Sequence, residues 1–290
     1  MDLQKILDEQ GFINSPVGIV TENQINSCNY DVFVFDGEDK KNTIITSENE
    51  FVIIHHASLN ETQSNKLLQY SQLQIIRDPS WDLQMLISKI HKKRLTLYSD
   101  FAKNCLIESM FCCQKAKESL KTSDVFASCW QKCAVCFLGD AILSLNYKNP
   151  NPLFVIDNFR KFETNQINEH ISVILQTIGV ERATPTLLER MLKSTIGFSD
   201  LIEKNNHSKL IQQNYDYFIQ NSMLSDCYFY LDYINKENFM KIKHNLYRNQ
   251  AFFHILKVAF DIESDSNLIL EYSDLIQKSC ATIIENISGE

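Results

Sequence analysis

The sequence predicts an α+β protein, in which an N-terminal domain of strands and short helices precedes an all-helical domain. Two observations carry this prediction. Residues 1–80 contain short apolar runs bounded by glycine, proline, aspartate and asparagine, a pattern typical of strands and turns. From Trp81 onward, apolar residues recur close to every 3.6 positions, which is the period of an α-helix. We place the domains at 1–90 and 91–290, with a further boundary expected near 181–185.

The N-terminal domain should open with a short amphipathic helix that stops near Gly11, because glycine commonly ends helices. The segment Asp78-Pro79-Ser80 predicts the start of a later helix, since proline suits a first turn and aspartate can cap it. Between these points we expect strands over 17–20, 31–35 and 51–55, a helix over 60–70 and a strand over 73–76.

In the second domain, residues 124–146 form the most apolar predicted helix. A helix that is apolar around most of its circumference usually lies at the centre of a bundle. Asp140 interrupts this segment, so we expect a buried carboxylate with a cationic partner. Arg160 and Lys161, which follow the Asn149–Pro152 break, are the candidate partners.

Composition bounds the classes of function. The chain has 290 residues, of which 44% are hydrophobic and 22% charged, as in globular proteins. A net charge of -8 argues against a broad nucleic-acid-binding surface. The longest apolar run, 133–145, is too short to span a membrane, and the N-terminus lacks a signal-peptide layout. Nine cysteines, mostly in apolar surroundings, suit a reducing compartment. We therefore expect a cytoplasmic protein with no membrane partner.

Residues 17–37 carry a motif-like arrangement. Gly18 lies in one apolar run, polar residues follow, and Asn29-Tyr30-Asp31 opens the strand DVFVF. This segment resembles the active-site hairpin of the DNA-polymerase-β-like nucleotidyltransferase superfamily, which places Gly-Ser in the first element and Asp-x-Asp in the second. The order of elements is closest to members with a helical C-terminal half, such as the aminoglycoside nucleotidyltransferases. The resemblance implies a mixed sheet in the N-terminal domain.

The resemblance also implies a catalytic centre in which three carboxylates hold two Mg²⁺ ions and a nucleoside triphosphate. Asp31 matches the second carboxylate and would be the metal ligand. Asn29 stands at the first position and, being neutral, is a weaker ligand for Mg²⁺. The strand expected to supply the third carboxylate ends in His55 and His56 instead, which become candidate ligands or proton-transfer groups. Gly18 would be the phosphate-loop residue.

The implied function is a nucleotidyltransferase-like protein with a degraded metal site, a pseudoenzyme. It would bind a nucleotide, another small polar ligand or a protein partner in a cleft between the two domains. If transfer activity remains, it is metal-dependent nucleotidyl transfer. The sequence leaves open whether the chain forms a homodimer.

Two other patterns offer alternatives. Cys129, Cys133 and Cys136 match the spacing that holds a [4Fe–4S] cluster in radical S-adenosylmethionine enzymes, but their apolar helical context favours buried core thiols over an iron–sulfur cluster. Arg248 and His254 resemble the Arg-x4–6-His motif of HEPN ribonucleases, in which a histidine base beside an arginine cleaves RNA. The alternatives are therefore a HEPN-like ribonuclease or toxin–antitoxin module, or a non-catalytic adaptor.

Overall fold

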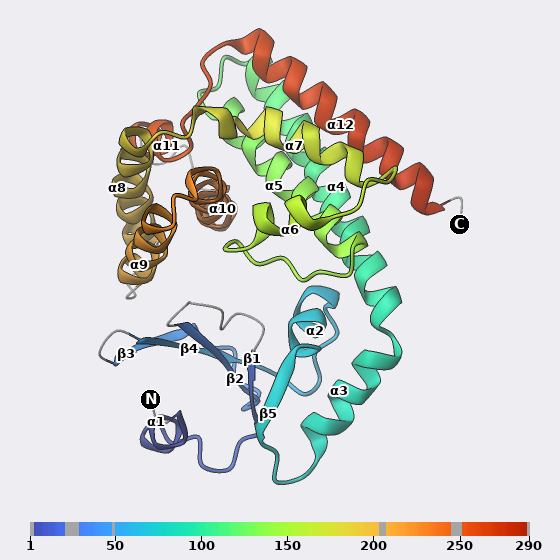
Figure 1. Cartoon of the computed structure of the whole chain (residues 1–290), viewed down its shortest axis with the longest axis vertical. Coiled ribbons are helices and arrows are strands. Elements are labelled where there is room, and N and C mark those ends of the chain that lie inside the picture. Colours follow the sequence, from blue (N-terminus) through green and yellow to red (C-terminus); the bar gives the residue numbers. More distant parts are fainter. Residues whose placement is uncertain (1–2, 21–28, 48–49, 203–206, 245–250, 289–290) are drawn as a thin grey trace. The chain divides into compact units, whose positions relative to one another are not determined.

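The computed structural model describes residues 3–20, 29–47, 50–202, 207–244 and 251–288 (Figure 1). Its internal packing divides the chain into two compact units, Met1–Tyr98 and Ser99–Glu290. A five-stranded sheet with short helices makes up most of the first unit, and the second is helical. The predicted α+β class is therefore confirmed. The expected boundaries at residue 90 and near 181–185 stay predictions.

The first unit is built on a mixed sheet with strand order β3-β4-β2-β1-β5. Strand β2 pairs with β4 in parallel, and the other three pairings are antiparallel. Its elements are α1 (Leu3–Glu9), β1 (Val17–Val20), β2 (Asn29–Val34), β3 (Thr43–Ser47), β4 (Glu50–His56), α2 (Ser64–Tyr70), β5 (Leu73–Arg77) and α3 (Asp82–Lys92).

Strand β3 was not predicted from the sequence. It lies at an edge of the sheet and pairs only with β4 among the described strands. Its sequence, TIITS, follows a run of charged and polar residues and contains only two large apolar side chains. An edge strand needs little burial, so it leaves a weak hydrophobic pattern.

The two faces of the sheet carry separate cores. On one face, Phe33 of β2 and Phe35, which directly follows β2, pack with Tyr70 of α2 and with residues of α3. On the other face, Val32 and Val34 pack with Leu7 of α1. Because successive residues of a strand point to opposite faces, this division also fixes the face on which each polar residue of β2 and β4 lies.

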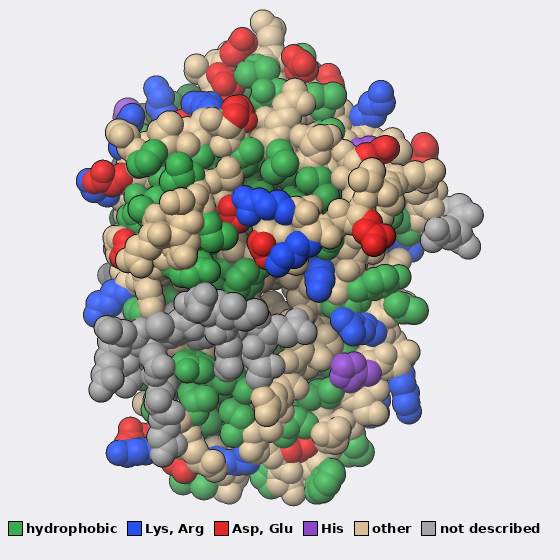
Figure 2. All heavy atoms as spheres, viewed as in Figure 1, with side chains coloured by type: hydrophobic (Ala, Val, Ile, Leu, Met, Phe, Trp, Pro, Cys, Tyr) green, Lys and Arg blue, Asp and Glu red, His purple; other side chains and the backbone are tan. Residues whose placement is uncertain are grey.

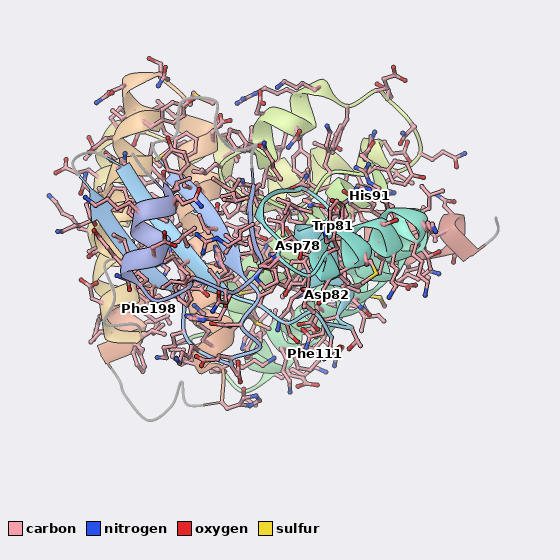
Figure 3. All side chains as sticks on the ribbon, turned by 90° about the horizontal axis from the view of Figure 1, so that it is seen from below. Asp78, Trp81, Asp82, His91, Phe111 and Phe198 are labelled. Atoms are coloured by element: carbon pink, nitrogen blue, oxygen red, sulfur yellow. The ribbon has the colours of Figure 1, made fainter. Side chains whose placement is uncertain are left out.

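Helix α3 begins at Asp82, later than the proline-based prediction (Figure 3). The carboxylate of Asp78 nevertheless accepts a hydrogen bond from the backbone N–H of Gln84 at 2.9 Å, so it does cap the first turn. Trp81 precedes the helix with φ of 66° and a residue exposure of 72%. A left-handed backbone at a bulky residue is uncommon and costs free energy.

The second unit is a bundle around α5, which packs against α7, α10 and α12 (Figure 1). Its helices are α4 (Arg94–Lys121), whose first residues belong to the first unit, α5 (Ala127–Leu145), α6 (Val155–Lys161), α7 (Ile171–Ile178), α8 (Pro185–Ile202), α9 (His207–Gln220), α10 (Leu224–Ile242), α11 (Ala251–Ala259) and α12 (Ser266–Ser288), with 3₁₀ turns at Asn168–His170 and Val180–Arg182. Nearly every residue of α5 is buried, as its all-round apolar pattern predicted.

Asp140 is buried, but its cation is not one of the two expected. The Nζ of Lys236 on α10 donates to its Oδ2 at 3.1 Å, and the Tyr233 hydroxyl donates to its Oδ1 at 2.9 Å. Arg160 instead makes a two-pronged ion pair with Asp226, at 2.9 and 2.6 Å. Lys161 pairs with Asp157 on its own helix. The prediction of the partner was wrong, because it used nearness in sequence and α10 lies far along the chain.

Cys129, Cys133 and Cys136 lie inside α5 within the apolar core. Burial raises the pKa of all three thiols, which keeps them protonated at physiological pH. Iron–sulfur clusters are held by thiolates, whereas these three buried thiols pack as small hydrophobic side chains.

On the face shown in Figure 2, acidic and basic side chains lie interspersed among hydrophobic and uncharged ones. Among the described residues, no helix combines the length and the apolar character needed to cross a membrane.

Candidate functional site

The parallel pairing of β2 and β4 brings Asp31 and His55 together. In this register Asp31 lies opposite Ile53, and Phe33 lies opposite His55. Residues two apart on a strand share a face, so Asp31, Phe33 and His55 lie on the same face of the sheet. The rings of Phe33 and His55 are stacked, with centroids 4.5 Å apart and planes at 15°.

A hydrogen bond joins the two polar side chains. His55 Nε2 lies 2.8 Å from Asp31 Oδ1, and the side chains are 23% and 27% exposed. When the ring is neutral and donates from Nε2, Nδ1 is left as an acceptor. When the ring is protonated, the pair is an ion pair with one further N–H donor. In both states Asp31 orients the imidazole, and solvent reaches both groups.

Tyr70 packs against Phe33 in an edge-to-face arrangement, with the ring centroids 5.7 Å apart and the planes at 73°. Burial raises the pKa of Tyr70 to about 12, with a further increase from the negative charge of Glu61. The phenol is therefore neutral at physiological pH, and its ring packs with Phe33 in the buried core on this face of the sheet.

His56 lies on the opposite face of the sheet from His55. Its Nδ1 is 2.7 Å from Asp36 Oδ2. Its ring packs edge-to-face against the Phe12 ring, with the two ring centroids 5.9 Å apart. The two neighbouring histidines therefore have different partners on opposite faces of the sheet, because successive residues of a strand point to opposite sides.

The remaining predicted site residues lie in β1 and at the start of β2. Gly18 is buried within β1, opposite Phe33, and not in a loop. Asn29 opens β2 opposite Phe51, and its side chain lies outside the described part of the structure. A Cβ at Gly18 would lie 3.0 Å from Leu73 Cβ on the adjacent strand β5.

We expect Gly18→Ala to destabilise the first unit by about 1–3 kcal/mol, the usual cost of overpacking a core. The added methyl group would press against the backbone-proximal part of Leu73, which cannot move without its strand. Urea unfolding measures the change. In a double-mutant cycle with Leu73→Ala, the cost of Gly18→Ala should fall only in part, because alanine removes Cγ and Cδ1 of Leu73 but keeps the Cβ that lies closest. Gly197→Ala in α8 is the matched control, because nothing lies within 4 Å of the added atom; an equal loss there would contradict the steric explanation.

Neither Asp36 nor Glu38 was among the site residues predicted from the sequence. Asp36 is hydrogen-bonded to His56, and Glu38 lies in the same cluster. The stacking of Phe33 on His55 was also missed. A parallel register between the two strands would have revealed both, but register is not visible in a single sequence.

The described residues do not fit a two-metal centre at Asp31. In this part of the chain, no further carboxylate, imidazole or thiolate joins Asp31 and His55 in a group of three with metal-binding geometry. Two Mg²⁺ ions require a set rich in charged oxygen. One carboxylate and one imidazole offer two ligand atoms, enough for at most part of the coordination shell of a single divalent cation.

Of the alternative ribonuclease pair, Arg248 lies outside the described residues. His254 lies on α11 and is exposed.

The chain is an α+β protein with a mixed five-stranded sheet and a helical second unit. Its candidate site is the hydrogen-bonded pair of Asp31 and His55 on the sheet. No protein-family model and no curated protein matches the chain. Among solved structures, the comparison finds a nucleotidyltransferase-like protein from Exiguobacterium sibiricum 255-15. It has 13% sequence identity and a TM-score of 0.34, and the match covers 87% of this chain and 89% of that one. At this level of similarity, no site residue or activity carries over from it.

Proposed function

We propose that the first unit binds a nucleotide or another small phosphorylated ligand at Asp31 and His55, as a nucleotidyltransferase-like protein without two-metal catalysis. The observation that supports this proposal is the 2.8 Å hydrogen bond between two partly exposed side chains on adjacent strands. The proposal concerns residues of the first unit alone.

The two side chains have complementary chemistry. The free oxygen of Asp31 can accept a hydrogen bond from a sugar hydroxyl or a base amino group, or share a cation with phosphate. The imidazole can donate to phosphate when it is protonated. Stacking on Phe33 holds the ring in place, so little side-chain entropy is lost on binding.

Binding without transfer is the activity that this donor set favours. In two-metal phosphoryl transfer, cations neutralise both the attacking and the leaving oxygens. A single carboxylate with one imidazole has too few oxygen ligands for that arrangement, and we therefore expect at most residual transferase activity.

The test is isothermal titration calorimetry of the full chain with ATP, CTP, GTP and UTP, with Mg²⁺ or Mn²⁺ present and absent. We expect saturable binding that Asp31→Asn weakens by roughly tenfold or more, because a charge-assisted hydrogen bond contributes ~1.5–3 kcal/mol. Asp39→Asn, an exposed carboxylate in the same unit, is the charge-matched control and should bind normally.

Two results would overturn the proposal. One is no binding of any nucleotide under any metal condition. The other is equal affinity in the Asp31→Asn and Asp39→Asn variants, which would place the ligand elsewhere.

A further inference from the structure

We propose a second site, on the opposite face of the sheet, in which Asp36, Glu38 and His56 bind a divalent transition-metal ion. Each of the three side chains offers one ligand atom, and these atoms lie within 4.8 Å of one another. Among the described residues, this is the cluster with the composition and spacing of a metal centre.

Backbone hydrogen bonds at the ends of β2 and β4 hold the cluster together. Asp36 lies just beyond β2, and His56 is the last residue of β4. The Gly37 N–H donates to the carbonyl of Ala57 at 3.0 Å, which ties the turn to the strand end. Gly37 has φ of +74°, a conformation open to glycine that turns the chain so that Glu38 lies near Asp36.

Two of the three ligands are already in place. The side chains of His56 and Asp36 are only 6% and 12% exposed, and their ligand atoms are 2.7 Å apart. This separation is close to that of neighbouring ligands in an octahedral complex, where metal–ligand bonds are near 2.0–2.1 Å. Packing of the His56 ring against Phe12 restricts its rotation. Binding a metal therefore requires the proton shared by His56 Nδ1 and Asp36 Oδ2 to leave to solvent, but little movement of either side chain.

Glu38 is the movable ligand and leaves the site open to solvent. Its side chain is 47% exposed and forms an ion pair with Lys40. The ammonium group and a metal ion would compete for the same carboxylate. The Lys40 side chain is 64% exposed and can turn away at little cost, since an exposed ion pair contributes little to stability.

The ligand set indicates the kind of metal. One imidazole nitrogen and two carboxylate oxygens suit Mn²⁺, Fe²⁺, Co²⁺ or Zn²⁺, with water in the remaining positions. Mg²⁺ and Ca²⁺ prefer oxygen throughout and should bind more weakly here. The site does not use Asp31 or His55, so it is independent of the proposed function.

The test titrates the full chain with Mn²⁺ by calorimetry and follows Co²⁺ binding by visible absorption. We expect Glu38→Gln to weaken binding by more than ~10-fold, the lower limit for losing even a residue that only supports a metal ligand. Glu38 is exposed, so this variant should fold normally. Lys40→Met should strengthen binding by removing the competing cation, an effect that a purely structural His56–Asp36 pair would not produce.

Asp39→Asn is the matched control, because it removes an exposed carboxylate from the same segment. Binding that persists in Asp31→Asn but is lost in Glu38→Gln and His56→Gln would support the site. Equal affinities in the Glu38→Gln and Asp39→Asn variants would overturn it, as would Co²⁺ absorption dominated by thiolate charge transfer. Nucleotide binding plays no part in these measurements, so either proposal can fail alone.

Discussion

Lys236→Met is expected to destabilise the second unit by about 3–5 kcal/mol, the usual cost of removing one partner of a buried ion pair. Lys236 Nζ lies 3.1 Å from Asp140 Oδ2, and both side chains are almost fully buried, at 6% and 5% exposure. The ammonium also lies over the rings of Phe137 and Tyr233, at 4.5 and 4.0 Å from their centroids. Without it, the Asp140 carboxylate stays in the core with only the Tyr233 hydroxyl to compensate its charge.

Urea unfolding followed by tryptophan fluorescence measures this loss. The chain has two tryptophans, and Trp81→Phe leaves Trp130 in the core of the second unit as the reporter. The control is Lys193→Ala, which breaks an exposed pair with Glu189 and should cost less than ~1 kcal/mol.

The double variant Asp140→Leu with Lys236→Met separates charge burial from packing. Replacing both partners by apolar groups should restore most of the stability, because no buried charge is left. A double variant as unstable as Lys236→Met would show that packing, and not the uncompensated carboxylate, causes the loss.

Lys132→Met is expected to destabilise the second unit more at pH 8 than at pH 5. Lys132 Nζ donates to Asp232 Oδ2 at 2.9 Å and to the Tyr228 hydroxyl at 2.8 Å, all buried. Burial raises the pKa of Asp232 to about 7. The positive charges of Lys132 and Arg182 lower this pKa, and the negative charge of Asp261 raises it.

The sign follows from proton binding. The pKa of an unfolded aspartate is about 3.9, and burial raises the pKa of folded Asp232 to about 7. Between these values the folded state binds more protons, so this group makes the free energy of unfolding fall as pH rises. Without the Lys132 ammonium the folded pKa rises further, and the fall continues above pH 7 by up to about 1.4 kcal/mol per pH unit.

Urea unfolding of Lys132→Met and of the parent chain at pH 5 and pH 8 measures this difference. Adding Asp232→Asn removes the titrating group and should abolish the extra loss at pH 8. Equal losses at both pH values in Lys132→Met would show that Asp232 does not titrate in this range.

Local pattern was enough for much of the fold. The apolar runs at β1, β2, β4 and β5 and the all-round apolar α5 were recognisable, because burial imposes a period on nearby residues. The edge strand β3 was missed, since it buries too little to impose one. The start of α3 was placed too early, because Pro79 lies before the left-handed turn at Trp81 and not within the helix.

The candidate site divides in the same way. Asp31, His55 and His56 were named as candidate site residues from the sequence alone, through the resemblance of residues 17–37 to a nucleotidyltransferase hairpin. Only the tertiary structure decided their partners: Asp31 for His55, Asp36 for His56, and Lys236 for Asp140. The physical reason is that periodicity is a property of neighbouring residues, whereas pairing depends on the parallel register of β2 with β4 and on the packing of α10 against α5. Those arrangements are set by the free energy of the whole core, and no local segment of the chain encodes them.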